Sequence, residues 1–496
     1  MWHSLKSSLL QLAVAWAFGL FTLAPTAAFA QLPTTNQPWA YVLVNDSSLI
    51  DDCPICARPT IVEPMRGTFQ LRRLEENPLR ARYALEDIHF AAGNRPYRVT
   101  GGGTFEIGGE VAVTLQMSLQ LQIDDGSTNK ACYFTNSTTT VDRPWPMMDV
   151  TLVQTNGTFT QTFTLRLAAA PVREIWFSTV AGFTPSAPLP PFNYVESGDL
   201  ISSSGRVVKR NADLFTSVGA FPPVPNLGLD AVDILPGGEI AFSLGSGIYS
   251  TTLGQLQNGD LLSTRGRIIR RNQDLLAAFM TEPATNNVGL DAVQVLDTGE
   301  ILFSIPTNVF SSQLGVALHR GDLLSSTGTI LRTNQQLLAR FHPASPTNDY
   351  GLDALYLWPS GEIWFSTETG FQDTALGPVL AGDLLSDQGY LVFRNLELLN
   401  AFAPIEDPVD FGLDALYVVT DATPPAPQPL LKIKPGSSTG SASLSWQGQG
   451  RVFQIERATA VTGPFQPLSS ILPDLFFDDL GALTNHAQSY YRLRQW

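Results

Sequence analysis

A unit of about 61 residues recurs four times in the middle of the chain, and it constrains the fold more than any other feature. The tetrapeptide Gly-Leu-Asp-Ala begins at Gly228, Gly289, Gly351 and Gly412, at spacings of 61, 62 and 61 residues (228 to 289, 289 to 351, 351 to 412). A Glu-Ile-x-Phe-Ser box begins at Glu174, Glu239, Glu300 and Glu362. A Gly-Asp-Leu box has its aspartates at Asp199, Asp260, Asp322 and Asp383. Boxes in a fixed order at a fixed spacing indicate copies of one supersecondary unit that pack against each other.

Each unit is predicted to consist of short β-strands. In the last complete copy, Leu352–Trp358 and Glu362–Ser366 are predicted strands joined by a Pro-Ser-Gly turn. Further strands are predicted near Asp383–Ser386 and over Tyr390–Arg394, followed by one helical turn at Leu398–Phe402. About four strands per unit is typical of a propeller blade.

The order of the boxes predicts how the two ends of the repeat region meet. The first box is the strand that begins at Glu174, and the last is the strand that begins at Gly412. Pairing these two strands would close a ring without free sheet edges, so we predict a four-bladed β-propeller over residues 171–420. In the alternative pairing, Phe163–Ala168 completes the first hairpin and the ring stays open.

The N-terminus indicates export. A basic start with Lys6 precedes an apolar run over Leu9–Leu23, and Ala28-Phe29-Ala30 has the small-x-small pattern that signal peptidase reads. Residues 1–30 are therefore predicted to be a signal peptide of a secreted or cell-envelope protein. No other stretch is long and apolar enough to span a membrane.

The segments on either side of the repeats are also predicted to be β-structure. Residues 31–170 alternate apolar and polar side chains over long runs, which is typical of an antiparallel sheet with one buried face, in a sandwich or a barrel. A Pro-rich linker is predicted over 421–430. Residues 431–496 are predicted to form a small β-sandwich. The predicted class is thus all-β throughout.

The repeat unit resembles propeller-like repeats of secreted, uncharacterised bacterial proteins, over residues 174–419. The last segment, with Phe453–Arg457, Gly463–Phe465 and Tyr490–Leu493, is similar to fibronectin type III-like modules of bacterial exoproteins. Such modules are generally spacers or adhesion elements. Neither resemblance implies a catalytic motif.

Composition excludes some partners. Thirty basic and forty-five acidic residues give a net charge of −15, which argues against binding to nucleic acid or to an anionic membrane. Metalloprotease, P-loop and dinucleotide motifs are missing from the sequence, and no catalytic residue is predicted.

The repeated aspartates have two interpretations. Their side chains are expected to accept backbone hydrogen bonds and fix the turns, because a catalytic pair would need carboxylates in different environments at one place. The alternative is contact with a cation, with calcium as the candidate, since hard ions prefer carboxylate oxygens. The eight residues concerned are Asp199, Asp230, Asp260, Asp291, Asp322, Asp353, Asp383 and Asp414.

The three cysteines are Cys53, Cys56 and Cys132. In an exported protein a disulfide with one thiol left over is the expected state, although the sequence does not say which residues pair. A redox role for Cys53-x-x-Cys56 and a zinc site of the three cysteines with His89 are the alternatives.

Two further features are interpreted as structural. Trp176 and Trp364 share one position of the Glu-Ile-x-Phe-Ser box and are expected to pack between blades, with sugar stacking as the alternative. Arg320, in an Arg-Gly-Asp tripeptide, is expected to be incidental surface, because the other units have Ser197, Asn258 and Ala381 there.

These observations favour a non-enzymatic exported protein that serves in binding, adhesion or as a surface scaffold. The partner, a surface glycan or a protein, is not defined by the sequence. A carbohydrate-active hydrolase on a propeller and a calcium-stabilised surface protein are the alternatives. A hydrolase would need two singular carboxylates about 5–9 Å apart in a pocket.

Overall fold

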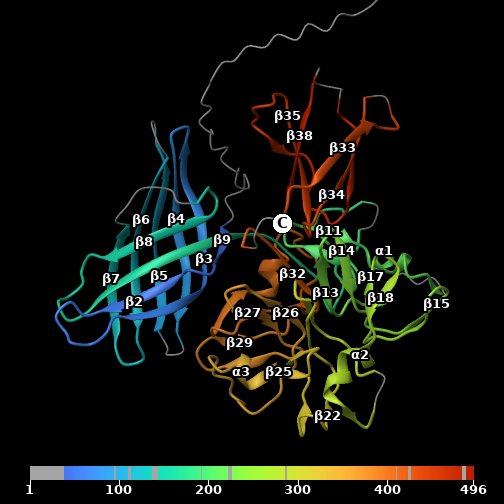
Figure 1. Ribbon diagram of the computed structural model, residues 1–496, viewed down its shortest axis with the longest axis horizontal. Helices are drawn as coiled ribbons and strands as arrows, with labels where there is room; N and C mark the ends of the chain where they lie inside the picture. Colours follow the sequence, from blue (N-terminus) through green and yellow to red (C-terminus); the bar gives the residue numbers. More distant parts are fainter. Residues whose placement is uncertain are drawn as a thin grey trace, which may run out of the picture.

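The computed structural model describes residues 38–93, 97–109, 113–136, 143–190, 193–221, 226–284, 287–408, 410–422, 426–438, 440–482 and 488–496 (Figure 1). The described chain is all-β, as predicted, and is built from antiparallel sheets. The predicted signal peptide, residues 1–30, lies outside the described residues. Among the described residues, no helix is both long enough and apolar enough to cross a membrane.

One antiparallel sheet holds the N-terminal segment. Its inward-facing side chains alternate with exposed ones, and β6 shows this most clearly, since Leu115, Met117, Leu119, Leu121 and Ile123 are all buried. Because every second side chain on a strand faces the same side, these residues join one apolar cluster. The strands are β1 (Trp39–Leu43), β2 (Ser48–Asp52), β3 (Ile61–Asn77), β4 (Arg80–Ala92), β5 (Tyr97–Gly108), β6 (Thr114–Asp124), β7 (Asn129–Asn136), β8 (Met148–Gln154) and β9 (Thr162–Phe177).

The prediction of an antiparallel sheet with one buried face is confirmed in this segment. The sequence predicted a sandwich or a barrel, whereas the structure has a single continuous sheet. Its order is β1-β3-β4-β5-β6-β7-β8-β9, and β2 pairs with both β3 and β9. The long strand β9 makes this continuity possible, because its sixteen residues pair with β8, β2 and β1 and then run on into the repeat region.

Four sheets of equivalent strand order follow, here called repeat sheets 1 to 4. Repeat sheet 1 is β32-β9-β10-β11, and its strands are part of the same sheet as the N-terminal strands. The other three are β13-β14-β17-β18, β20-β21-β24-β25 and β26-β27-β30-β31. Their bounds are β10 (Leu200–Ser202), β11 (Arg206–Lys209), β13 (Val232–Leu235), β14 (Glu239–Phe242), β17 (Leu261–Ser263), β18 (Arg267–Arg270), β20 (Val293–Val295), β21 (Ile301–Phe303), β24 (Leu323–Ser325), β25 (Thr329–Arg332), β26 (Ala354–Leu357), β27 (Ile363–Ser366), β30 (Leu384–Ser386), β31 (Tyr390–Phe393) and β32 (Leu416–Thr420).

The two ends of the repeat region pair with each other. Leu416 lies opposite Phe177 and Tyr417 opposite Trp176, so β32 completes the hairpin of the first Glu-Ile-x-Phe-Ser strand. The alternative pairing is wrong, because Phe163–Leu167 pairs with β2 and β8 instead. The first strand of each repeat sheet, here called the inner strand, contacts the inner strands of the two neighbouring sheets. The contacts run from β13 to β20, from β20 to β26, from β26 to β32 and from β32 back to β13. They therefore surround a common axis.

Short helices and outer hairpins connect the strands of the repeat sheets. The helical turns begin at the repeated asparagines, slightly before the predicted Leu398–Phe402 turn: α1 (Asn211–Thr216), α2 (Asn272–Leu276) followed by the 3-10 turn η1 (Ala277–Phe279), α3 (Asn334–Leu337) and α4 (Asn395–Leu398). The outer strands are β12 (Ala220–Phe221), β15 (Ile248–Ser250), β16 (Gly254–Leu256), β19 (Thr281–Glu282), β22 (Val309–Ser311), β23 (Val316–Leu318), β28 (Phe371–Asp373) and β29 (Gly377–Val379).

Two three-stranded sheets form the C-terminal segment, β33-β34-β37 and β36-β35-β38. Both contribute to one apolar cluster that contains Leu444, Trp446, Phe453 and Ile455. The bounds are β33 (Leu430–Pro435), β34 (Ala442–Gln447), β35 (Phe453–Ala458), β36 (Gln466–Pro467), β37 (Phe476–Asp479) and β38 (Tyr490–Gln495).

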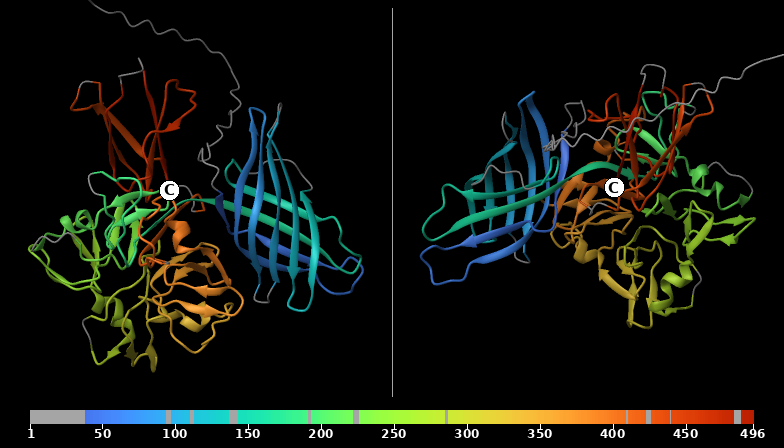
Figure 2. Two further views of the ribbon diagram at one scale, coloured as in Figure 1. Left: turned by 180° about the vertical axis from the view of Figure 1, so that it is seen from behind. Right: turned by 45° about the horizontal axis from the view of Figure 1, so that its top comes forward.

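Both flanking segments lie against the repeat sheets (Figure 2). On the N-terminal side, the His89 ring stacks on Tyr390 of repeat sheet 4 with centroids 5.0 Å apart. On the C-terminal side, Lys209 Nζ lies 2.7 Å from Asp474 Oδ1, and the backbone amide of Gly237 donates to Gly450. These contacts place the C-terminal segment at the hairpin-turn end of the inner strands.

Candidate functional site

The aspartates of the Gly-Asp-Leu boxes, here called the turn aspartates, hold backbone in place. In the second unit, Asp260 accepts hydrogen bonds from the backbone amides of Gln257 and Asn272, and Arg271 pairs with it at 2.6 Å. The same two amide contacts recur in every unit, three residues before and twelve residues after the aspartate. The members are Asp199, Asp260, Asp322 and Asp383, and all four are buried.

One turn aspartate, Asp322, has no arginine partner among the residues that the structure describes. Arg210, Arg271 and Arg394 pair with the turn aspartates of their own units, but the third unit has Thr333 at this position. Burial raises the pKa of Asp322, and the two backbone amides and the charge of His319 oppose this shift where the other units use an arginine. The arginine therefore serves to neutralise a carboxylate that the turn has already buried.

The repeated asparagines connect each unit to the next. Asn272 Nδ2 donates to the carbonyl oxygen of Gly289 at 2.9 Å, and its Oδ1 accepts from the amide of Val288 at 2.8 Å. Asn211, Asn334 and Asn395 make the equivalent pair of contacts. Each asparagine thus fixes the glycine that opens the next Gly-Leu-Asp-Ala box.

A cyclic set of hydrogen bonds runs through the serines of the Glu-Ile-x-Phe-Ser boxes. Each buried hydroxyl donates to the leucine carbonyl of the next Gly-Leu-Asp-Ala box, and the fourth returns to repeat sheet 1. The pairs are Ser178 to Leu229 (2.7 Å), Ser243 to Leu290 (3.1 Å), Ser304 to Leu352 (2.7 Å) and Ser366 to Leu413 (2.8 Å). The two ends of the repeat region are therefore joined as the interior junctions are.

The aspartates of the Gly-Leu-Asp-Ala boxes, Asp230, Asp291, Asp353 and Asp414, are used differently. These axial aspartates stand just before the inner strands β13, β20, β26 and β32, at the opposite end of the axis from the hairpin turns. Burial and then the charges of the neighbouring carboxylates raise the pKa of Asp291, Asp353 and Asp414. Since Asp230 acts on the pKa of the other three, the four carboxyl groups form one electrostatic cluster.

A fifth carboxylate joins the axial aspartates from the fourth unit. Glu368 lies two residues after Ser366, at a position where the other units have Val180, Gly245 and Pro306. Its charge raises the pKa of both Asp291 and Asp353. Arg320 pairs with Glu368 at 2.8 Å, so the interpretation of Arg320 as incidental surface is wrong.

The other end of the axis is covered by the C-terminal segment. Arg451 lies 3.6 Å from Asp233 and 2.8 Å from Asp297, and it donates to the carbonyl oxygen of Ile234. Burial raises the pKa of Asp233 to about 6, although Arg451 and two backbone amides oppose this shift. Tyr356 and Tyr417, from two neighbouring inner strands, lie in the same electrostatic environment.

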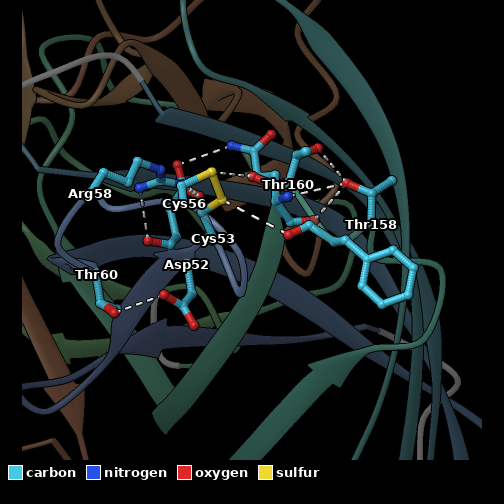
Figure 3. The surroundings of a disulfide bond; sticks show 10 residues. Asp52, Cys53, Cys56, Arg58, Thr60, Thr158 and Thr160 are labelled. Carbon is cyan, nitrogen blue, oxygen red and sulfur yellow. Dashed lines mark hydrogen bonds and ion pairs between the residues drawn. A yellow bond between two sulfur atoms is a disulfide. The ribbon is translucent and has the colours of Figure 1, made fainter.

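Cys53 and Cys56 form a disulfide in the loop after β2 (Figure 3). Arg58 pairs with the buried Asp51 at 2.6 Å on this loop, and the carbonyl oxygens of Phe159 and Thr160 lie 3.9 Å and 3.8 Å from the two sulfurs. Cys132 is a buried free thiol of β7, and burial raises its pKa.

The structure does not assemble the zinc alternative. His89 stacks on Tyr390, and burial lowers the pKa of its imidazole. Among the described residues, no three metal-ligating side chains stand close enough together to hold an ion as they are. Sugar stacking is wrong for Trp176 and Trp364, because both rings are fully buried and donate to Glu174 and Glu362.

A cavity of about 300 Å³ lies between the C-terminal segment and residues of β11, α1 and repeat sheet 2. Its carboxylate Glu239 accepts from Ser263 and pairs with Arg265 and Arg267, and Asp474 at its edge pairs with Lys209. Carboxylates neutralised in this way are poor candidates for the acid and base of a hydrolase.

No protein-family model matches the chain, and no curated protein matches it either. Function must therefore be argued from the side chains. Sequence reasoning found both sets of aspartates but not Glu368 or Arg451, whose importance depends on contacts with distant parts of the chain. The sequence could have singled out Glu368, because the other units have Val, Gly or Pro at this repeat position.

Proposed function

We propose that the protein is an exported, non-enzymatic binding protein whose repeat region presents a rigid recognition surface. The observation that carries this proposal is the use made of the repeated polar side chains. The turn aspartates, the asparagines and the serines all bond within the repeat region, each to a backbone group. A motif set used in this way stabilises a scaffold and leaves recognition to the variable surface.

The repeat region is proposed to be a closed four-bladed β-propeller. Support comes from the pairing of β32 with β9, from the cyclic contacts of the inner strands and from the return of the serine bonds to repeat sheet 1. Closure would remove the exposed sheet edges that an open row of units carries.

Export of the protein and the role of its C-terminal segment are proposed on separate grounds. The Ala28-Phe29-Ala30 pattern supports a signal peptide, and a Cys53–Cys56 disulfide is compatible with an oxidising compartment. Two small antiparallel sheets around Trp446 and Phe453 support a fibronectin type III-like spacer. Its contacts with repeat sheet 2 would hold the spacer against the scaffold.

The outer hairpins are the best candidate for the recognition surface. Phe221 and Tyr249 lie opposite each other on β12 and β15 and are 59% and 54% exposed. In the next unit, Met280 and Phe310 are also exposed. Exposed aromatic rings on a rigid scaffold fit the flat faces of sugar rings, so we propose a surface glycan as the partner.

The test is a glycan and surface-polymer binding screen on the mature protein, run beside a broad hydrolase panel. The double variant Phe221→Ala/Tyr249→Ala should bind its glycan at least tenfold more weakly. Phe476→Ala, an equally exposed ring of β37 in the C-terminal segment, serves as the control and should bind normally. Binding to no glycan, or equal loss in both variants, would contradict the proposal.

Hydrolysis is the second candidate, and one observation favours it. Glu368 is a singular carboxylate beside Asp291, and a glycosidase needs two carboxylates in unequal environments. Its ion pair with Arg320 argues against a proton-donating role. Product formed in the hydrolase panel and abolished by Glu368→Gln would replace the binding proposal.

A further inference from the structure

The four inner strands carry different polar side chains at one shared position. Three residues after the aspartate of each Gly-Leu-Asp-Ala box, repeat sheets 1 to 4 have Tyr417, Asp233, Gln294 and Tyr356. Apolar residues precede and follow this position in all four strands. Equivalent positions of equivalent strands lie at the same level, and the rings of Tyr356 and Tyr417 accordingly have centroids 6.4 Å apart. One level of the axis is therefore lined by side chains that differ between otherwise similar units.

The scaffold does not need the negative charge of Asp233. Its Oδ2 accepts a hydrogen bond from the amide of Val295 on the next inner strand, at 2.7 Å. Gln294 makes the equivalent link one unit further on, since its Oε1 accepts from the amide of Leu357 at 2.6 Å. A neutral side chain is thus sufficient to join two inner strands. Asp233 is only 3% exposed, and a buried charge is costly unless a partner compensates for it.

Arg451 of the C-terminal segment supplies the compensating charge. Its Nη1 lies 3.6 Å from Asp233 Oδ1 and donates to a backbone carbonyl oxygen of β13, and its Nη2 lies 2.8 Å from Asp297 Oδ1. Burial raises the pKa of Tyr356, and the charges of Asp233 and Arg451 then shift it in opposite directions. The guanidinium group therefore contacts two carboxylates and a carbonyl oxygen, in the neighbourhood of a buried tyrosine ring.

Other contacts hold the C-terminal segment in place. Val452 and Ile471 are buried in one apolar cluster with residues of repeat sheets 1 and 2. The amide of Gly237 donates to the carbonyl oxygen of Gly450 at 2.8 Å. The guanidinium group of Arg451 also borders solvent on one side, because its partner Asp297 is 90% exposed. Arg451 thus occupies a site that can be reached from outside, in a segment that is anchored by other residues.

We propose that this level of the axis, with Asp233 and Asp297 as its carboxylates, is a binding site for a guanidinium group that Arg451 fills as a built-in competitor. A planar fork of donors beside carboxylates and aromatic rings suits guanidinium better than ammonium. Two sources have this chemistry, a small guanidinium compound and the arginine side chain of a polypeptide. Either ligand would enter when Arg451 moves out, so the C-terminal segment controls access. The site shares no residue with the outer hairpins and does not depend on the glycan proposal.

The experiment removes the competitor. The Arg451→Ala variant of the full mature chain is titrated in a calorimeter with N-ethylguanidinium chloride, at an ionic strength held constant with NaCl. One ion per chain is expected to bind, about tenfold or more tightly than to the wild type, in which Arg451 competes. Ethylammonium chloride should bind about tenfold or more weakly, because it lacks the planar fork of donors. No binding of ethylguanidinium, or equal binding to the wild type, would overturn the proposal.

Two double variants locate the bound ion. In the Arg451→Ala background, Asp233→Asn should weaken ethylguanidinium binding about tenfold or more, and it is expected to fold because the neutral Gln294 makes the equivalent link. Asp274→Asn, at an exposed aspartate of α2, removes the same charge and should leave binding unchanged. Equal affinities of the two double variants would place the ion elsewhere and contradict the proposal. N-acetylarginine amide distinguishes the sources, since binding as tight as that of ethylguanidinium assigns the site to an arginine side chain, and much weaker binding assigns it to a small compound.

Hydrogen exchange separates a binding site from a structural anchor. The amide of Gly237 reports whether the C-terminal segment stays in place, because it donates to Gly450. In Arg451→Ala its exchange rate should stay within about tenfold of the wild-type rate. An amide that exchanges about a hundredfold faster would show that Arg451 anchors the segment, and this would overturn the proposal.

Discussion

At the scale of single residues, the repeated polar side chains act on the backbone of their own unit or of the next one. A turn aspartate is buried because two amides need an acceptor, and the arginine then compensates for the buried charge. The third unit forms the same turn, although it has Thr333 in place of the arginine. Because the third unit folds with threonine at this position, an arginine-to-threonine substitution in another unit should lower stability without preventing folding.

Arg271→Thr copies the third unit into the second. We expect a loss of about 1–3 kcal/mol in the free energy of unfolding, because Asp260 is fully buried and loses a charged hydrogen bond. Denaturant unfolding measures it. The control is Arg270→Thr, an exposed neighbour whose guanidinium donates to the carbonyl oxygen of Ile269, next to it in the chain. Equal stability of the two variants would show that the arginine does not compensate for the buried carboxylate.

Asp233 predicts a pH dependence of stability. Its pKa in the folded protein is about 6, above the usual value of 3.8, so its contribution is present at low pH and is lost as pH rises through 6. The stability of the wild type relative to Asp233→Asn should therefore fall by about 2–3 kcal/mol between pH 4 and pH 7. Unfolding by denaturant across this range measures the difference.

The control for this experiment is Asp297→Asn, which removes an exposed carboxylate from the same guanidinium of Arg451. A difference between the wild type and Asp233→Asn that stays constant with pH would contradict the account. The groups near Asp233 that also titrate or carry charge are Arg451, Asp297, Tyr356 and Tyr417.

At the scale of elements, the strand assignments could be predicted because turn residues and boxes recur four times. Leu352–Trp358 and Tyr390–Arg394 were predicted as strands and contain β26 and β31. The alternation in the N-terminal segment predicted its antiparallel strands, but not that they form one sheet. That outcome depends on β9, whose sixteen residues pair with five different strands: β1, β2, β8, β10 and β32.

The serine bonds give a series of four variants, of which three are matched, because Ser178 also accepts a hydrogen bond from the amide of Ala415. Each alanine removes a buried hydroxyl and leaves a leucine carbonyl without its donor, at an expected loss of about 1–3 kcal/mol in unfolding free energy. If the ring is closed, Ser366→Ala should be as destabilising as the interior variants. Thermal and denaturant unfolding measure the series Ser178→Ala, Ser243→Ala, Ser304→Ala and Ser366→Ala.

The interior variants Ser243→Ala and Ser304→Ala serve as the controls for Ser366→Ala. A silent Ser366→Ala beside a destabilising Ser243→Ala would mean that the two ends of the repeat region are held together less firmly than its interior. The account predicts equal losses for Ser243→Ala, Ser304→Ala and Ser366→Ala, and a loss at least as large for Ser178→Ala.

At the scale of the whole molecule, the sequence could not predict the contacts between segments. Arg451 stands in a Gly-Gln-Gly-Arg turn without a distinctive pattern, yet it reaches Asp233 across 218 residues (451 − 233). The cluster of axial aspartates with Glu368 likewise depends on the arrangement of four units around one axis. Local propensity carries no information on such distant pairs, whereas it does predict strands and turns.

The central claim is that residues 174–420 form a ring whose last strand is held as firmly as its interior strands. Native-state hydrogen exchange tests it without any substitution, by comparing the amides of β32 (Leu416–Thr420) with those of β26 (Ala354–Leu357). The account predicts that both strands are protected to the same order of magnitude and are released together. Amides of β32 that exchange about a hundredfold faster than those of β26 would contradict it.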